Sequence, residues 1–238
     1  MTETLLIGAL FAAAAAVLGR LFRTLPENHE VISEALEAKL EQEKEVEERK
    51  DEEMLIDLEI LLTDAEQEQK RKNFAAAERA LARVLKDSPE NARAHTLLAS
   101  VMLDQGKFKE TIAEATSAIS ADALNAVAYN ILGLAQFALK RYAPAADAFE
   151  HAVTIDNSKP QRYVNLALSY HELKKGKKEA SALKKAFVLD PDNLDVVKLL
   201  ARAAVENKDK GTARSALEKL LKLDAENEWA KRELARLK

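Results

Sequence analysis

Two consecutive stretches of 34 residues decide the fold: residues 92–125 (ARAHTLLASVMLDQGKFKETIAEATSAISADALN) and residues 126–159 (AVAYNILGLAQFALKRYAPAADAFEHAVTIDNSK). They align with each other without a gap. A small residue recurs at every 34th position of the chain: Ala65, Ala99, Gly133, Ala167, Ala201 and Ala235. A fixed period with a small residue in register indicates that one close helix crossing is repeated along a stack of units.

Each unit divides into two amphipathic helices. In residues 126–159 the apolar positions of the first helix are Tyr129, Leu132, Gly133 and Phe137, and those of the second are Ala145, Phe149, Ala152 and Val153. Three glycines, Gly106, Gly176 and Gly211, lie near the turn between the two helices of a unit. A left-handed conformation is convenient in such a turn, and glycine adopts it without steric cost.

The 34-residue period, the Leu-Ala or Leu-Gly pair in the first helix and the Asp190-Pro191 close of a unit resemble the tetratricopeptide repeat (TPR) family. The resemblance covers about residues 58–238. It implies an all-α chain that forms an α-solenoid of antiparallel helix pairs, the TPR superhelix. The expected repeats are 58–91, 92–125, 126–159, 160–193 and 194–227, and residues 228–238 form a C-terminal capping helix. Repeat 4 departs from the family pattern with Glu179, where a small residue is usual.

Residues 1–25 are expected to form an N-terminal transmembrane anchor. The run TLLIGALFAAAAAVLG from Thr4 to Gly19 is uninterrupted, and Leu21 and Phe22 extend it past Arg20 toward the roughly 17–25 residues that a span requires. A cleaved signal peptide and a soluble helix are the alternatives. Because Arg20 and Arg23 follow the run, the positive-inside rule leaves the N-terminus outside and the repeats in the cytoplasm. We therefore expect a single-pass membrane protein, and the low aromatic content, the absence of cysteine and the richness in alanine favour the bacterial inner membrane.

Residues 26–57 are expected to form an acidic helical linker. Residues 27–53 carry twelve acidic and four basic side chains, a net charge of −8, and contain no glycine or proline. Clean apolar heptads are absent, so a solvated helical spacer is favoured over a dimerising coiled-coil stalk. The whole chain has a net charge of −4, which argues against nucleic acid as a general partner.

The family resemblance also implies a concave groove lined by the first helices. The candidate partner-binding residues in this register are Thr96, Ser100, Leu103, Asn130, Leu134, Phe137, Val164, Leu168, His171, Lys198, Arg202 and Val205. These residues form a mixed groove with an apolar middle, which suits an extended peptide or an amphipathic helix of a protein partner. The carboxylate clamp of some family members is not implied, because only Asn165 matches its pattern.

No motif in the sequence indicates an enzyme, a metal site or a cofactor. The chain has no cysteine, and its four histidines, His29, His95, His151 and His171, occur singly without metal-ligand spacing. The expected function is therefore a non-catalytic, membrane-anchored TPR adaptor that binds protein partners at the cytosolic membrane face. A self-associating scaffold, with at least weak homo-oligomerisation, and a secreted or periplasmic repeat protein remain the alternatives.

Two further features lead to expectations. Six lysines surround the turn of repeat 4 (Lys174, Lys175, Lys177, Lys178, Lys184 and Lys185), where solubility is favoured over contact with anionic lipid or with the acidic linker. Gly133 is the one glycine in the column of small residues. We expect leucine at this position to overpack a helix crossing of about 8 Å, whereas alanine could stabilise the helix by up to about 1 kcal/mol.

Overall fold

The computed structural model describes residues 29–237, which form eleven helices and, within that range, no strand. The chain divides into two compact units, one ending at Leu58 and the other beginning at Glu59. Helix α2 (His29–Lys70) contains the acidic segment and runs without a break into the first helix of repeat 1. The expected membrane anchor, residues 1–25, lies outside the described residues.

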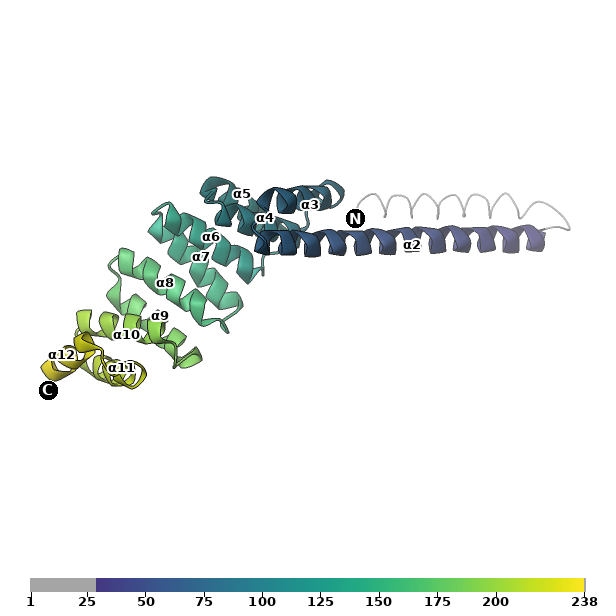
Figure 1. The fold of residues 1–238 in the computed structure, drawn as a ribbon. Coiled ribbons are helices and arrows are strands. Elements are labelled where there is room, and N and C mark those ends of the chain that lie inside the picture. Colours follow the sequence, from purple (N-terminus) through teal and green to yellow (C-terminus); the bar gives the residue numbers. More distant parts are fainter. Residues whose placement is uncertain (1–28, 238) are drawn as a thin grey trace. The chain divides into compact units, whose positions relative to one another are not determined.

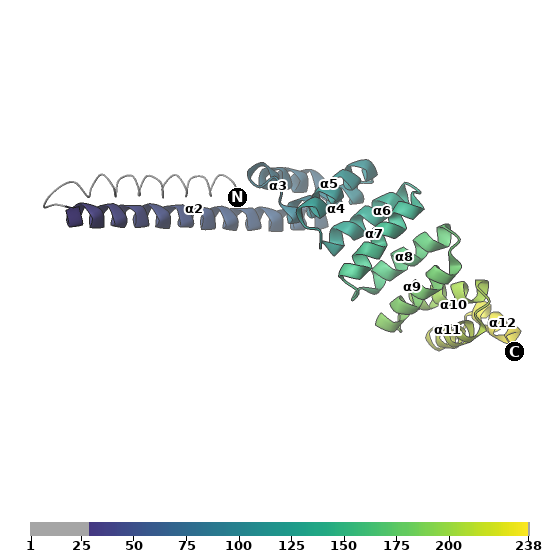
Figure 2. The same cartoon turned by 180° about the vertical axis from the view of Figure 1, so that it is seen from behind.

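The second unit is a stack of antiparallel helix pairs that follow one another in chain order (Figures 1 and 2). After the C-terminal part of α2, the first helices are α4 (Ala92–Asp104), α6 (Ala126–Ala138), α8 (Pro160–Glu172) and α10 (Leu194–Glu206). The second helices are α3 (Phe74–Asp87), α5 (Phe108–Ala121), α7 (Tyr142–Ile155), α9 (Gly176–Leu189) and α11 (Lys210–Leu223), and α12 (Glu228–Arg236) ends the stack. The expected all-α repeat solenoid is confirmed for this unit.

Asparagine fixes the start of four first-position helices in the stack. The amide N–H groups of Ala94, Ala128 and Ala230 donate to the side chains of Asn91, Asn125 and Asn227, and Asn193 caps α10 in the same way. Such a cap satisfies an amide that the helix leaves without a partner and stabilises by about 1 kcal/mol. At the fifth site Lys159 makes no side-chain cap, but Pro160 follows it at the first helical position, where an N–H would lack a partner in any case.

Lysine, and not glycine, supplies most of the left-handed turns between paired helices. Lys72, Lys140, Lys174 and Lys208 have φ angles of 56–61°, and Gly106 takes the equivalent place in repeat 2 with φ of 73°. Of the three glycines expected there, Gly106 alone has the left-handed conformation. Gly176 and Gly211 lie two or three residues later, inside the first turns of α9 and α11.

The crossing of α6 and α7 is closer than the sequence suggests. A Cβ atom at position 133 would lie 2.6 Å from Cε1 of Phe149 and within 2.8 Å of two further ring atoms. Phe149 is only 1% exposed and belongs to a core cluster with Ala145, Leu166 and Leu183, so its ring has little room to move. The expectation that alanine fits at position 133 is therefore wrong: the ring of Phe149 occupies the space a methyl group needs.

We predict that Gly133→Ala destabilises the array by about 1–3 kcal/mol, the usual cost of overpacking a core. This cost exceeds the gain of up to about 1 kcal/mol in helix propensity that alanine brings. Gly211→Ala is the matched control, because a Cβ there would meet its nearest neighbour, Asp209 Oδ1, at an ordinary 3.8 Å. Urea unfolding followed by circular dichroism measures both changes. Equal stabilities of the two variants would show that the α6–α7 crossing is looser than described.

Candidate partner-binding groove

The 34-residue register places two residues, four apart, at the middle of each first helix. Along the array these pairs are Leu62 and Glu66, Thr96 and Ser100, Asn130 and Leu134, Val164 and Leu168, Lys198 and Arg202, and, in the end helix, Arg232 and Arg236. Residues four apart share one helix face. The second residue of each pair therefore changes along the array from polar, through apolar, to cationic, whereas Leu62, Thr96 and Val164 among the first residues are buried.

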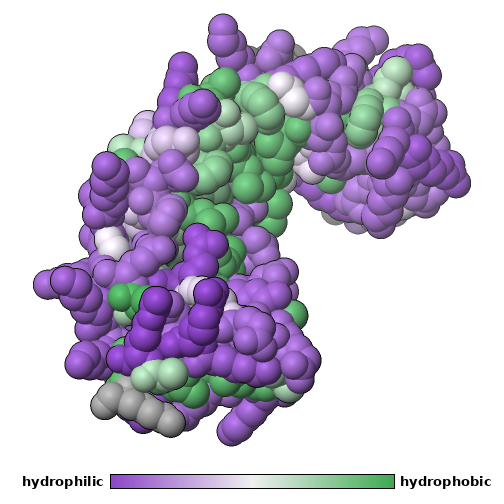
Figure 3. Space-filling model, turned by 60° about the vertical axis from the view of Figure 1, so that its left-hand side comes forward, coloured by the Kyte–Doolittle hydropathy of each residue, from purple (hydrophilic) through white to green (hydrophobic). Residues whose placement is uncertain are grey.

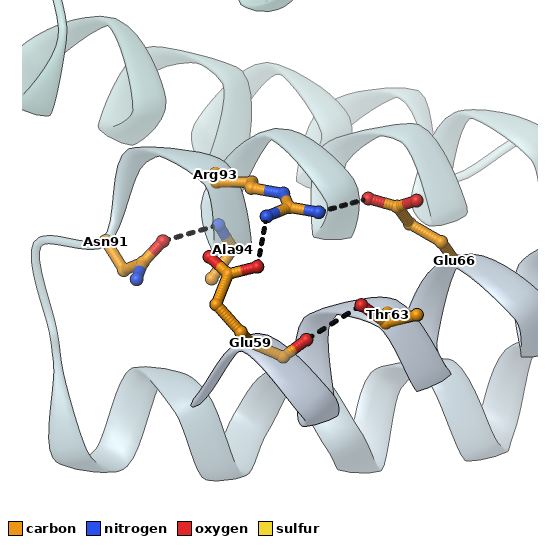
Figure 4. Close-up of polar contacts among 6 residues, drawn as sticks. All are labelled: Glu59, Thr63, Glu66, Asn91, Arg93 and Ala94. Carbon is orange, nitrogen blue, oxygen red and sulfur yellow. Dashed lines mark hydrogen bonds and ion pairs between the residues drawn. The ribbon is translucent and has the colours of Figure 1, made fainter. Parts of the chain in front are cut away.

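At the polar end, side chains of repeats 1 and 2 bond to one another. The guanidinium of Arg93 contacts Glu59 at 2.7 Å and Glu66 at 2.9 Å (Figure 4). Hydrogen bonds to Glu66 and Glu59 raise the pKa of Arg93. The side-chain amide of Gln69 donates to Ser100 at 2.8 Å and to Asp104 at 2.7 Å. The polar groups on this part of the surface already have protein partners.

Two other candidates from repeat 2 also have structural contacts. Thr96 is 9% exposed, donates to the carbonyl of Ala92 at 2.7 Å and accepts from Asn125 at 2.9 Å. Leu103 packs against a core cluster that contains Ala99 and Ile131. With Ser100 bonded to Gln69, all three candidates of this repeat hold the array together.

The middle of the array presents apolar side chains that its own packing leaves open. Leu168 is 37% exposed and Val127, which sequence reasoning missed, is 49% exposed. Leu134 and Phe137 are partly buried against the main core cluster. Figure 3 shows hydrophobic side chains gathered in a band across the middle of the face it presents, with hydrophilic side chains on either side.

Two of the candidate residues in the middle of the array, Val164 and Asn130, make contacts within the protein instead. Val164 is 7% exposed and packs in a small cluster with Ala186 and Val196. Asn130 accepts a hydrogen bond of 3.1 Å from Asn165, which joins α6 to α8. Val164 therefore acts as a core residue, and Asn130 as a link between repeats.

The cationic end carries Lys198 and Arg202 at the middle of α10. Neither makes an ion pair within the described part of the chain. The acidic residues Asp195 and Glu206 lie near the two ends of the same helix. Val205, one turn from Arg202, packs against the main core cluster.

The imidazole of His171 contacts the buried carboxyl group of Glu179. Its Nδ1 atom lies 3.1 Å from Glu179 Oε1, and Glu179 is 9% exposed. Burial raises the pKa of Glu179, the contact with His171 and the charge of Arg202 oppose this effect, and the charge of Glu206 adds to it. The corresponding residues of the other repeats are Ala77, Thr111, Ala145 and Ala213, so repeat 4 alone places an ionisable group in this core position.

Arg93, Gln69 and Val127 lie on or beside the candidate surface, and sequence analysis missed them. Glu59 and Arg93 are 34 residues apart, and Gln69 and Asp104 are 35 apart. Equivalent positions of adjacent repeats are neighbours in a solenoid. Opposite charges or complementary polar groups about 34 residues apart could therefore have predicted these contacts.

The described residues contain no group of three or more His, Asp or Glu side chains that could hold a metal ion. In the same part of the chain, no helix combines the length and the hydrophobicity that a membrane span requires.

We predict that Glu179→Gln removes a pH-dependent destabilisation. Because the folded-state pKa is raised above the ordinary 4.5, the stability that this group contributes is fully present below pH 4.5 and is lost as the pH rises through the raised pKa. The stability of the variant relative to the parent should therefore increase as the pH rises above 4.5. Unfolding free energies measured across this range test it, with the exposed Glu218→Gln as the control. A difference that does not change with pH would contradict the prediction.

Comparison with known proteins agrees with this geometry. Residues 69–134 and 126–159 match two sequence models described as tetratricopeptide repeat. No curated protein matches the chain.

Several solved structures are similar in fold. The MamA protein, known from a crystal structure, is 22% identical in sequence to this chain. The two structures superpose with a TM-score of 0.62, and the similarity covers 76% of this chain and 94% of MamA. PilF of Pseudomonas aeruginosa is 23% identical, with a TM-score of 0.63 and coverage of 76% and 82%. YrrB, described as a TPR protein with an unusual peptide-binding site, is 14% identical, with a TM-score of 0.61 and coverage of 73% and 89%. Residues 69–159 therefore carry tetratricopeptide repeats, and the array as a whole has the fold of a TPR solenoid.

Proposed function

We propose that the protein is a non-catalytic adaptor that binds an apolar segment of a protein partner along α6 and α8. One observation carries the proposal: the apolar side chains in the middle of the array are open, whereas the polar side chains of repeats 1 and 2 bond to one another. Val127 and Leu168 are the most exposed of these apolar residues. Burial of such a side chain contributes roughly 1.5–3 kcal/mol.

The cationic end of the groove sets the expected direction of the ligand. Lys198 and Arg202 lie beyond the apolar middle, and neither has an ion-pair partner among the described residues. Carboxylates of a partner would find these cations without breaking an existing ion pair, which avoids the cost of leaving a charge unpaired. A segment with apolar residues followed by acidic ones fits this surface.

The membrane anchor remains part of the proposal on sequence grounds. The apolar run between Thr4 and Gly19 and the flanking Arg20 and Arg23 support a single span with the N-terminus outside and the repeats in the cytoplasm. The array would then gather its partners at the cytosolic face of the membrane, and the bacterial inner membrane is the proposed location.

Peptides selected on the full-length protein from a random display library test the groove. We predict that Val127→Glu/Leu168→Glu weakens their binding at least about tenfold, because each carboxylate would have to be desolvated under an apolar ligand.

The matched control is Leu124→Glu/Val188→Glu, which makes the same change at two exposed apolar residues (75% and 77% exposed) away from the middle of the first helices. Equal losses in the two variants, or selection of no peptide at all, would contradict the proposed function.

The absence of cysteine in the chain makes its orientation directly measurable. We predict that a membrane-impermeant maleimide labels Thr2→Cys in intact bacterial cells, whereas it labels Ser120→Cys, an exposed position of α5, only after permeabilisation. Labelling of Ser120→Cys in intact cells would contradict a cytoplasmic array, and recovery of the chain in the soluble fraction would contradict the anchor.

A further inference from the structure

A second recess lies on the other side of α8, between the second helices α7 and α9. We call it the α7–α9 cleft; it has a volume of about 320 Å³. Tyr163, Leu166 and Tyr170 of α8 line it. These residues are three and four apart and share one helix face, and this face differs from the one that carries Leu168 in the groove. The cleft is therefore distinct from the groove.

The interior of the cleft is apolar and aromatic. Leu166 and Ala182 are buried, Val153 is partly buried, and Tyr163 and Tyr170 are each 5% exposed. The volume lies at the lower end of the range of about 300–1,000 Å³ that is common for ligand pockets. One apolar side chain, with part of the adjoining backbone, is an occupant of suitable size.

Two lysines of α9 stand at the edge of the cleft. Lys178 Nζ lies 5.0 Å from the ring centroid of Tyr170, and Lys185 Nζ lies 5.6 Å from that of Tyr163. The lysines are seven residues apart, which corresponds to about 10.5 Å along a helix. A peptide with carboxylates on both sides of one apolar residue could reach both ammonium groups.

The single carboxylate that lines the cleft is already engaged. Glu150 accepts a hydrogen bond from the hydroxyl of Tyr170 and lies 3.3 Å from Lys178. Lys185 makes no ion pair within the described residues. The lining therefore has an excess of positive charge, and Lys185 can pair with an added anion without breaking an ion pair of the described residues.

The packing of the repeats does not require lysines over these two rings. At the equivalent positions repeat 3 has Tyr129 stacked on His151, with ring centroids 5.0 Å apart, and Gln136 in place of Tyr170. Repeat 5 has Val197 and Ala204 in place of the two tyrosines. The two tyrosines hold packing positions of the repeat, as Tyr129 does in repeat 3, but two tyrosines that are both covered by lysines occur in repeat 4 alone.

We propose that the α7–α9 cleft is a second binding site, which takes an acidic peptide segment of a protein partner. One apolar side chain of the segment fills the space between Tyr163 and Tyr170, and flanking carboxylates bind Lys178 and Lys185. A peptide is favoured over a lipid surface because the apolar floor is recessed below the lysines, so a side chain must reach into it. The site goes beyond the proposed groove and would let the array hold two partner segments at once.

The chain has only four tyrosines, so NMR spectra of the full-length protein with ¹³C-labelled tyrosine rings report on the cleft directly. The probes are two nine-residue peptides with a central Phe, one with Glu and one with Lys at the flanking positions. The Glu peptide should shift the ring signals of Tyr163 and Tyr170 and leave that of Tyr142 unchanged. Lys178→Glu/Lys185→Glu should weaken its binding at least tenfold. Lys86→Glu/Lys222→Glu, the same charge change at two exposed lysines of α3 and α11, should not.

Three results would overturn the assignment: equal binding of the Lys peptide, unchanged ring signals of Tyr163 and Tyr170, or the same ring shifts with anionic lipid vesicles in the absence of peptide. Methyl signals of Leu168, recorded in parallel, separate this site from the groove. Ligands that shift Leu168 and leave both tyrosines unchanged would overturn the cleft but leave the proposed function intact.

Discussion

The close crossing of the two helices within each repeat is the constraint on which the array depends. A small residue of the first helix faces a residue of the second helix sixteen positions later. The register pairs Ala65 with Leu81, Ala167 with Leu183 and Ala201 with Leu217, and in repeat 3 the glycine is paired with the larger Phe149. In repeat 3 the larger ring is thus matched by a smaller partner, which keeps the crossing filled without forcing the helices apart, whereas repeat 2 pairs two alanines, Ala99 and Ala115. Neighbouring pairs can then stack with the same geometry from one repeat to the next.

Because the crossing uses only one face of each helix, the remaining faces are free to differ between repeats. At the middle of the first helices, the position of Glu66 and its equivalents is polar in repeats 1 and 2, apolar in repeats 3 and 4, and cationic in repeat 5. On the opposite side of α8, the combination of two tyrosines with two lysines that lines the α7–α9 cleft does not recur in repeats 3 and 5. The scaffold is thus uniform inside, and its surface chemistry changes along the array, which is the arrangement expected of a protein that holds partners.

The periodic features of the fold were predictable from the sequence, and the individual side-chain contacts were not. The recurring Ala65, Ala99 and Gly133 indicated the crossing because a helix axis can approach only where side chains are small. The sequence did not show that position 133 lacks room for a methyl group, because the position of the Phe149 ring depends on the surrounding core. The left-handed turns were assigned to glycines on preference alone, yet Lys72 and Lys174 adopt them where the flanking helices fix the backbone. The contacts of Arg93 with Glu59 and Glu66 likewise depend on how neighbouring helices are placed, and so does the contact between His171 and Glu179.

A double-mutant cycle at Gly133 and Phe149 tests the crossing most directly. The four proteins are the parent, Gly133→Ala, Phe149→Leu and the double variant, and the measured quantity is the free energy of unfolding in urea. The double variant recreates the Ala–Leu pair of repeats 1, 4 and 5. The account predicts that alanine at position 133 costs about 1–3 kcal/mol opposite phenylalanine and less than about 0.5 kcal/mol opposite leucine. The same cost in both backgrounds would contradict it, because position 133 would then not meet the side chain at position 149.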